Sequence, residues 1–256
     1  MDILLTNDDG IRAVGLRALY GALTHAGHRV HVAAPMTEQS AVGHSVTLFS
    51  PLRVKEVEEK GFSGLGISGT PADCVKLALS HLLPRRPDVI VSGINAGANV
   101  GVDVLYSGTV SAATEGALAG IPAMAVSVDD FHPEELSAQA EYATRLLNEE
   151  FWGAFPRHCV LNLNFPAGRL DQAKGLKVCR QTGSTYRDWY DERKDPRGNP
   201  YFWLCGVIPE ENVAPDTDRG CLSDGYITVT PLTFDLTHAA YLETLRGHLE
   251  TNDLKF

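Results

Sequence analysis

Two adjacent carboxylates, Asp8 and Asp9, follow an apolar run in the stretch ILLTNDDG. Neighbouring carboxylates repel each other, so this position requires a compensating positive charge or a polar partner for each. Carboxylate and neutral side-chain oxygens suit Mg²⁺, Mn²⁺ or Ca²⁺ and not Zn²⁺. The alternative is that Asp8 or Asp9 caps the helix that follows. Capping accounts for only one of the two carboxylates, so the pair favours a divalent-cation site.

Loops rich in Gly, Ser, Thr and Asn follow the other predicted strands, namely PMTEQSAVGHS with Ser40 and Ser45, the segment 68–70, and SGINAGANVG continuing into YSGTVSAA. Any one of these loops has ordinary loop composition. In open parallel sheets, however, ligands bind outside the carboxyl ends of the strands, where such loops meet. Glycines there allow backbone N–H groups to approach a phosphate, and a helix starting at Ser107 or Thr109 would present its positive end to it.

Three familiar motifs are missing from the sequence, and one glycine-rich stretch does not match a fourth in register. The sequence contains no HExxH, no GxxxxGK[ST] and no GxSxG, which disfavours a zinc protease, a P-loop nucleotide-binding protein and an α/β-hydrolase. The glycines of GINAGANVG do not match GxGxxG in register, so a dinucleotide-binding loop is also disfavoured.

Predicted strands and helices alternate up to about Pro166. The strands are DILL, HRVHVAAP, GLGISG, PDVIVSG, PAMAVSV and CVLNLNFP, and the helices are GLRALYGALTHAG, PADCVKLALSHLL, VSAATEGALAG and PEELSAQAEYATRLLNEE. This alternation predicts an α/β fold with a doubly wound, mostly parallel sheet. The segment VTLFSPLRVKEVEE predicts a hairpin around Ser50–Pro51 as a local interruption.

The composition changes after about residue 182. The stretch TYRDWYDERKDPRGNPYFWLCG is rich in Tyr, Trp, Arg and Asp and has a turn at DPRGNP, which predicts a long hairpin arm that pairs with another subunit. The strand GYITVTPLTFDLT and the amphipathic helix HAAYLETLRGHLE close the chain. We therefore expect a core over 1–182, and over 183–256 an arm, closing strand and C-terminal helix that are not an independent domain.

The bulk composition excludes several classes of protein. The 256 residues are 44% hydrophobic, which is enough for one large α/β domain, and the net charge of −10 comes without the basic stripe of a nucleic-acid binder. Five scattered cysteines without a CxxC pair indicate reduced thiols in a cytoplasmic protein. No signal peptide is expected, and no apolar run approaches the ~20 residues of a membrane span.

Six segments together resemble the SurE family, the stationary-phase survival proteins that act as 5'-nucleotidases. They are ILLTNDDG, QSAVGHS, GTPADCV, PDVIVSGINAGANVG, YSGTVSAATEGALAGIPAMAVS and TDRGCLSDGYITVTPL, in the family's order. The resemblance implies a Rossmann-like core with a C-terminal extended hairpin and helix used for oligomerisation, as a homodimer or a dimer of dimers. It is weakest over 130–160 and 184–212.

The family's metal ligands fall on Asp8, Asp9, Ser40 and Asn95, which implies one Mg²⁺ or Mn²⁺ per subunit. The family often has Gly after the ligand Ser, whereas this chain has Ala41, which leaves the ligand intact but changes the freedom of the loop. Candidate phosphate-binding residues are Asn99, Ser107, Gly108 and Thr109. Asp8 is expected to orient the attacking water as well as to bind the metal.

The resemblance implies metal-dependent hydrolysis of nucleoside 5'-monophosphates to nucleoside and phosphate, with 3'-nucleotides and short polyphosphate as further candidate substrates. A covalent aspartyl-phosphate mechanism is disfavoured, because enzymes that use it resemble a DxD pattern and here the two acids are adjacent. The alternative from another class is a non-catalytic regulator that binds a nucleotide or phosphate through the metal.

Overall fold

The computed structural model of the protein describes residues 1–185, 187–207 and 213–251. The strands in these ranges are β1 (Asp2–Thr6), β2 (Arg29–Pro35), β3 (Val54–Glu59), β4 (Phe62–Ile67), β5 (Val89–Ala96), β6 (Ala123–Val128), β7 (Val160–Phe165), β8 (Leu176–Val178), β9 (Arg187–Lys194), β10 (Pro200–Val207) and β11 (Ile227–Leu232). The helices are α1 (Val14–His25), α2 (Pro71–Leu77), the π-helical η1 (Ala78–Leu82), α3 (Asp103–Tyr106), α4 (Gly108–Leu118), α5 (Ser137–Arg145), α6 (Glu149–Gly153), the 3₁₀ turn η2 (Leu170–Gln172), α7 (Asp218–Ser223) and α8 (Ala239–Thr251).

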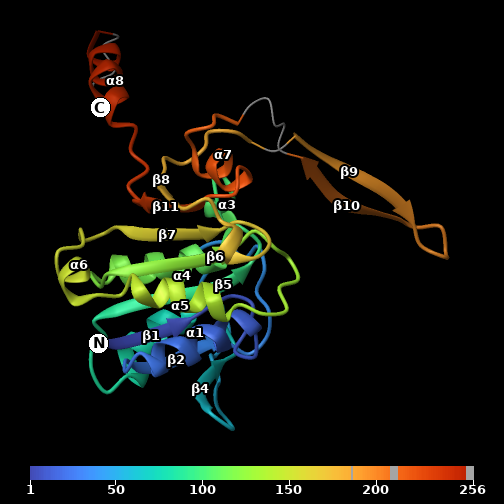
Figure 1. Ribbon diagram of the computed structural model, residues 1–256. Coiled ribbons are helices and arrows are strands. Elements are labelled where there is room, and N and C mark those ends of the chain that lie inside the picture. The colour runs from blue at the N-terminus through green and yellow to red at the C-terminus, as the bar shows by residue number, and fades with distance from the viewer. Residues whose placement is uncertain (186, 208–212, 252–256) are drawn as a thin grey trace.

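The body of the protein is one sheet with helices packed on both faces (Figure 1). The strand order is β3-β4-β2-β1-β5-β6-β7-β11-β8, and the pairs that join β2, β1, β5, β6 and β7 are all parallel. The pairs β3–β4 and β11–β7 are antiparallel. The predicted α/β fold with a doubly wound, mostly parallel sheet is therefore confirmed.

Alternate residues of the central strands are buried against different helical layers. Ile3 and Leu5 of β1 pack in the cluster that contains α1 and α5, whereas Leu4 packs in the cluster that contains α2 and α4. Because both faces of the sheet are covered, the central strands β1, β5 and β6 are buried over nearly their whole length and are largely apolar. The same order brings the carboxyl ends of β1, β2, β5 and β6 to one edge of the sheet, where the site lies.

Two local predictions were wrong. The hairpin is not centred on Ser50–Pro51, because β3 pairs with β4 across the turn Lys60–Gly61 and places Glu59 opposite Phe62. Val57 and Phe62 are buried by this pairing, and burial sets the register where one face of a strand is covered. The long helix predicted over PEELSAQAEYATRLLNEE is two helices, because Asn148 accepts a hydrogen bond of 2.8 Å from the backbone N–H of Phe151 and starts α6.

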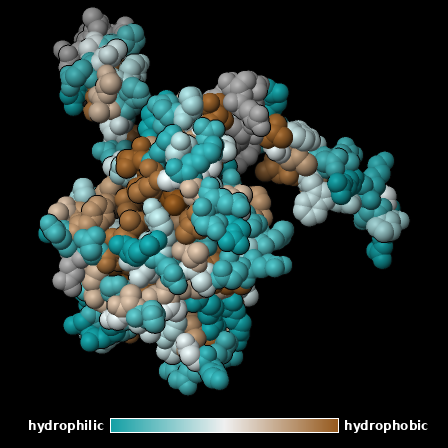
Figure 2. Space-filling view, viewed as in Figure 1, coloured by the Kyte–Doolittle hydropathy of each residue, from teal (hydrophilic) through white to brown (hydrophobic). Residues whose placement is uncertain are grey.

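The predicted hairpin arm is present as β9 and β10, and it projects from the body in Figure 1. Its turn is closed by the N–H of Asn199, which donates to Asp195 Oδ1 over 2.8 Å. Figure 2 shows hydrophobic residues where the arm joins the body and hydrophilic residues at its tip. The strand that follows the arm returns to the body, since β11 lies between β7 and β8 in the sheet.

Candidate active site

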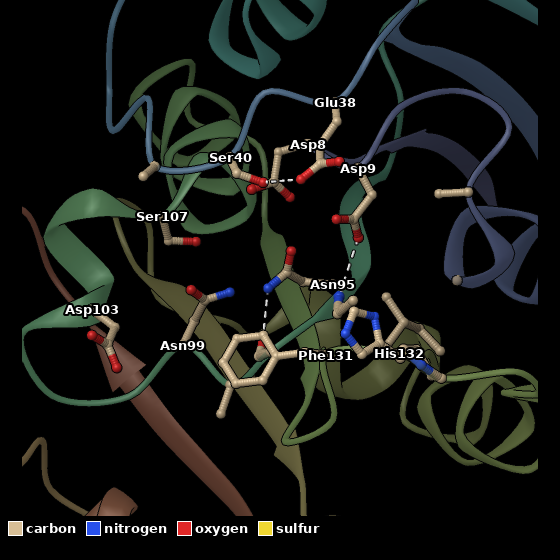
Figure 3. A pocket seen from close by; sticks show the side chains of 18 of the residues that line it. Asp8, Asp9, Glu38, Ser40, Asn95, Asn99, Asp103, Ser107, Phe131 and His132 are labelled. Carbon is tan, nitrogen blue, oxygen red and sulfur yellow. Dashed lines mark hydrogen bonds between the residues drawn. The ribbon is translucent and has the colours of Figure 1, made fainter. Parts of the chain in front are cut away.

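A cavity of about 700 Å³ opens at the carboxyl edge of the sheet, between the loops that follow β1, β2, β5 and β6. Figure 3 shows the side chains that line it. The four predicted metal ligands, Asp8, Asp9, Ser40 and Asn95, all line this one cavity. They come from three different strand ends, as expected from the way open parallel sheets build ligand sites.

Asp8 is held in place by the segments on either side of it. Thr109, in the first turn of α4, donates its hydroxyl to Asp8 Oδ1, and the carbonyl of Asp8 accepts the backbone N–H of Gln39 over 2.8 Å. The helix after the carboxylate pair begins at Val14 with Ala13 as its N-cap, and no side chain makes a capping hydrogen bond there. Neither Asp8 nor Asp9 is therefore used as a helix cap.

Asp9 accepts the backbone N–H of Ala96 over 3.1 Å through one carboxylate oxygen. Burial raises the pKa of Asp9 to about 7, and repulsion from Asp8 adds to this shift. Burial also raises the pKa of Asp8, although the hydrogen bond from Thr109 acts in the opposite direction. Burial and mutual repulsion make it unfavourable for both carboxylates to be ionised at the same time. A cation bound between them offsets this cost.

Asn95 and Ser40 supply neutral oxygens to the same space. The Asn95 amide nitrogen donates to the carbonyl of Gly97 over 2.7 Å, so its Oδ1 points toward the carboxylates in Figure 3. The Ser40 hydroxyl donates to Glu38 Oε1 over 2.5 Å, and Glu38 also lines the cavity. Two carboxylates, one amide oxygen and one hydroxyl form the hard-oxygen donor set that Mg²⁺ and Mn²⁺ prefer.

The donor set depends on neutral oxygens. Among the residues that the structure describes, no cluster of three or more His, Cys, Asp and Glu side chains is arranged to hold a metal ion. A cation at this edge would therefore need Ser40 and Asn95 in addition to Asp8 and Asp9. These four residues fit a divalent cation of the Mg²⁺ type, and none of them is a His or Cys, the ligands typical of zinc.

The loop that carries Ser40 is fixed at several points. His44 Nε2 lies 2.8 Å from Glu115 Oε1 on α4, and the N–H of Gly43 donates to the carbonyl of Tyr106 over 2.9 Å. Ala41, which stands where the SurE family often has Gly, has a φ of 55°. This left-handed conformation costs a non-glycine residue roughly 1–2 kcal/mol, so the contacts on both sides hold the loop in this conformation.

The four candidate phosphate-binding residues lie around the start of α4 and the loop after β5. Ser107 is the N-cap of α4 and accepts the N–H of Val110 over 3.0 Å, while its hydroxyl also lines the cavity. Gly108 packs on Asp8, where a Cβ would lie 2.8 Å from the Asp8 Cβ. Thr109 is fully buried and its hydroxyl is taken by Asp8. Asn99 lines the cavity and donates its amide nitrogen to Ser127 Oγ over 2.8 Å.

Some residues at this edge were missed, and others belong elsewhere. Glu38, Phe131 and His132 line the cavity and were not predicted. The rule that ligands bind at the carboxyl ends of parallel strands could have identified them, because Glu38 follows β2 and the other two residues follow β6. The segment 68–70, which was expected at the site, instead starts α2, where Thr70 and Asp73 form a capping box.

Comparisons with known proteins show the family of this chain. The family model described as Survival protein SurE matches residues 3–188. The chain is 61% identical over 245 residues to a protein named 5'-nucleotidase SurE from Nitratidesulfovibrio vulgaris (strain DSM 19637 / Miyazaki F), covering 96% of this chain and 91% of that one. It is 60% identical to a protein of the same name from Maridesulfovibrio salexigens, covering 96% and 98%.

A solved structure agrees as well. The crystal structure of the Sure protein from Aquifex aeolicus superposes with a TM-score of 0.83 at 36% identity, and the match covers 98% of this chain and 100% of that one. The matched family region contains every residue assigned above to the cavity edge. The chain belongs to the SurE family.

Proposed function

We propose that this protein is a divalent-metal-dependent phosphatase that hydrolyses nucleoside 5'-monophosphates to nucleoside and phosphate. The observation that carries the proposal is the convergence of Asp8, Asp9, Ser40 and Asn95 on one cavity that also contains the start of α4. The names of its relatives, with which it shares about 60% of residues over nearly the whole chain, support the same reaction.

Asp8, Asp9, Ser40 and Asn95 would hold the cation, Mg²⁺ or Mn²⁺, which when bound polarises the phosphoryl group and lowers the pKa of water. Asp8 accepts a hydrogen bond from the attacking water and so orients its oxygen toward phosphorus. Thr109 keeps Asp8 in one orientation, because its hydroxyl donates a hydrogen bond to Asp8 Oδ1.

The start of α4 stabilises the charge that develops on the phosphoryl oxygens. The helix has eleven residues, and its N-cap residue Ser107 lines the cavity. The positive end of a helix favours an anion, and Gly108 allows the start of α4 to pack directly against Asp8. One amide hydrogen of Asn99 is taken by Ser127, and the second is directed to phosphate in this proposal.

A phosphate-release assay tests the proposal. AMP, GMP, CMP, UMP, 3'-AMP and short polyphosphate are incubated with the protein in Mn²⁺, in Mg²⁺ and after EDTA treatment. Metal-dependent release of phosphate from the 5'-nucleotides supports the proposal. Release from 3'-AMP or short polyphosphate shows how broad the substrate range is. Tight binding of AMP without phosphate release in either metal would instead indicate the non-catalytic regulator.

The partner in this proposal is a second copy of the chain, giving a homodimer or a dimer of dimers. Apolar side chains are exposed on both faces of the arm, as Trp189, Trp203 and Phe202 are each about half exposed. Helix α8 exposes Leu242, Leu245 and Leu249, which lie at helical spacing on one side. Isolated hairpins are marginal in water, and aromatic residues of this kind are enriched at interfaces.

We assign different roles to the two parts of the chain. Residues 1–182 carry the metal and phosphate site, and 183–256 carry the arm, the closing strand and the C-terminal helix. Within the described ranges, no helix has both the length and the apolar character needed to cross a membrane. All five cysteines are free, which supports a cytoplasmic location for the enzyme.

A further inference from the structure

Phe131 lies in the loop after β6, lines the candidate active site and is exposed over 76% of its surface. Figure 3 shows its ring among the side chains of Asn95, Asn99 and His132. A second cavity, of about 800 Å³, is also lined by Phe131, together with Val207 at the end of β10 and Pro215 before α7. The ring therefore lies between the candidate active site and a second, partly apolar cavity.

The ring of Phe131 lies against the backbone of Gly97. Gly97 has a φ of +104°, and a Cβ there would lie 2.9 Å from Cε1 of Phe131, so only glycine leaves room for the ring. The N–H of Gly97 donates to the carbonyl of Val128 over 2.9 Å, and the N–H of His132 donates to Asp130 Oδ1 over 2.9 Å. The loop thus holds the ring over the strand ends while most of the ring surface stays uncovered.

An uncovered aromatic ring beside a phosphate site matches one part of a nucleotide in particular. A nucleobase is joined to its 5'-phosphate through the ribose, so it must lie close to, but outside, the phosphate pocket. Stacking on an aromatic ring suits every base, because every base has a π-face. Purines have the larger face and therefore bury more of the ring.

We infer that Phe131 is the platform on which the nucleobase of the substrate stacks. This inference rests on the proposed nucleotidase function and adds a residue that determines substrate preference. It predicts that the protein accepts all four common bases, with purines preferred over pyrimidines. It also predicts that phosphate monoesters without a base are poorer substrates, because they make no contact with Phe131.

The test compares Phe131→Ala, Phe131→Leu and Phe131→Trp with the wild type, using AMP, UMP and ribose 5-phosphate as substrates in Mn²⁺. We expect Phe131→Ala to raise KM for AMP by about tenfold or more, in line with stacking losses measured elsewhere. Phe131→Leu, which keeps apolar cover without a π-face, should lose nearly as much, and Phe131→Trp should retain the wild-type KM. The kcat/KM for ribose 5-phosphate should stay within about twofold in all variants.

Phe49→Ala is the matched control, since Phe49 is a fully exposed phenylalanine on the loop before β3, outside this cavity. It should change none of these values. Adenosine binding followed by NMR line broadening gives a readout without turnover, and Phe131→Ala should weaken it to a similar degree as it raises the KM for AMP.

Several outcomes would overturn the inference. Equal losses for AMP and ribose 5-phosphate would mean that Phe131 only shapes the cavity. An unchanged KM with an altered oligomeric state would mean that the ring contacts a second copy of the chain. A wild-type protein that releases no phosphate from any nucleotide would overturn the proposed function itself, which is a different result from an active enzyme that is insensitive to Phe131.

Discussion

The hydroxyl of Thr109 donates a hydrogen bond to Oδ1 of Asp8, although the two residues lie 101 positions apart in the sequence. The bond joins the first turn of α4, which is proposed to bind phosphate, to the carboxylate that is proposed to orient water. Both residues are buried, so the bond has little competition from solvent. This contact couples the two halves of the site.

Replacing Thr109 with Val tests that coupling. Val has the same shape but no hydroxyl, so Asp8 would lose its partner, a change worth about 1.5–3 kcal/mol for a hydrogen bond to a charged group. We expect kcat to fall by about tenfold to a hundredfold, with the circular dichroism spectrum unchanged. Thr109→Ser, which keeps the hydroxyl, is the control and should retain most of the activity. A fully active Thr109→Val enzyme would show that Asp8 is oriented by other groups.

Asp8→Asn and Asp9→Asn should each abolish hydrolysis while leaving the fold intact. Each change removes an anionic ligand and relieves repulsion between buried carboxylates, so stability without metal should not fall. Saturating Mn²⁺ should raise the Tm of the wild type by several degrees, because binding at 100 times Kd stabilises a protein by about 2.7 kcal/mol. Neither variant should show this rise. Asp171→Asn, an exposed carboxylate paired with Arg169, is the control. Near-normal turnover of either variant in limiting Mn²⁺ would exclude that residue as a ligand.

Ser40→Ala should lose much of the activity, by roughly tenfold or more, because a neutral ligand and the bond to Glu38 are removed together. Ser45→Ala is matched to it on the same loop. Ser45 is exposed and only its carbonyl is used, as an acceptor for the hydroxyl of Thr70. Steady-state kinetics in a Mn²⁺ titration should show a raised metal requirement for Ser40→Ala only. Equal effects of the two substitutions would contradict the ligand assignment.

Asp73 should make stability depend on pH below the neutral range. Although burial alone would raise the pKa of Asp73, hydrogen bonds from Thr47 and Thr70 lower it below its ordinary value. A lowered pKa in the folded state means stabilisation that is present above the ordinary aspartate pKa of about 3.9 and is lost as the pH falls toward the folded value.

Asp73→Asn should therefore lower the free energy of unfolding at pH 7 by about 1–3 kcal/mol, since it weakens the α2 capping box and the bonds to Thr47. The difference from the wild type should narrow between about pH 4.5 and pH 3 in urea titrations. Glu56→Gln, an exposed carboxyl on β3, should shift stability by less than about 0.5 kcal/mol at either pH. A difference that does not change with pH would mean that Asp73 contributes through shape alone.

The combined substitution of Trp189 and Trp203 by Ser should convert the proposed dimer into a folded monomer. The register of the arm pairs Trp189 with Cys205 and Trp203 with Asp191, so both indole rings lie on the same face of the hairpin. Light scattering and circular dichroism would measure mass and fold together. Removing residues 195–199 at the tip is the control and should leave the mass unchanged. A wild-type protein that is monomeric at micromolar concentration would refute the dimer.

Periodicity and motif order in the sequence determined most of the architecture of the body. The alternation of apolar strands with amphipathic helices predicted the parallel sheet, because strands covered on both faces are mostly apolar. The same pattern placed Asp8, Asp9, Ser40 and Asn95 at strand ends, and parallel strands bring their carboxyl ends to one edge. These predictions follow from local spacing and from a general rule of sheet geometry, so the sequence was sufficient for them.

Only the tertiary structure decided which groups meet. The bond from Thr109 to Asp8, the bond from Ala96 to Asp9 and the place of Phe131 over Gly97 join segments that are distant in sequence or separated by a whole strand. The hairpin register at Lys60–Gly61 was likewise set by burial of Val57 and Phe62, not by the proline that marked the wrong turn. Local composition does not predict such contacts, because they depend on how the strands are ordered in the sheet.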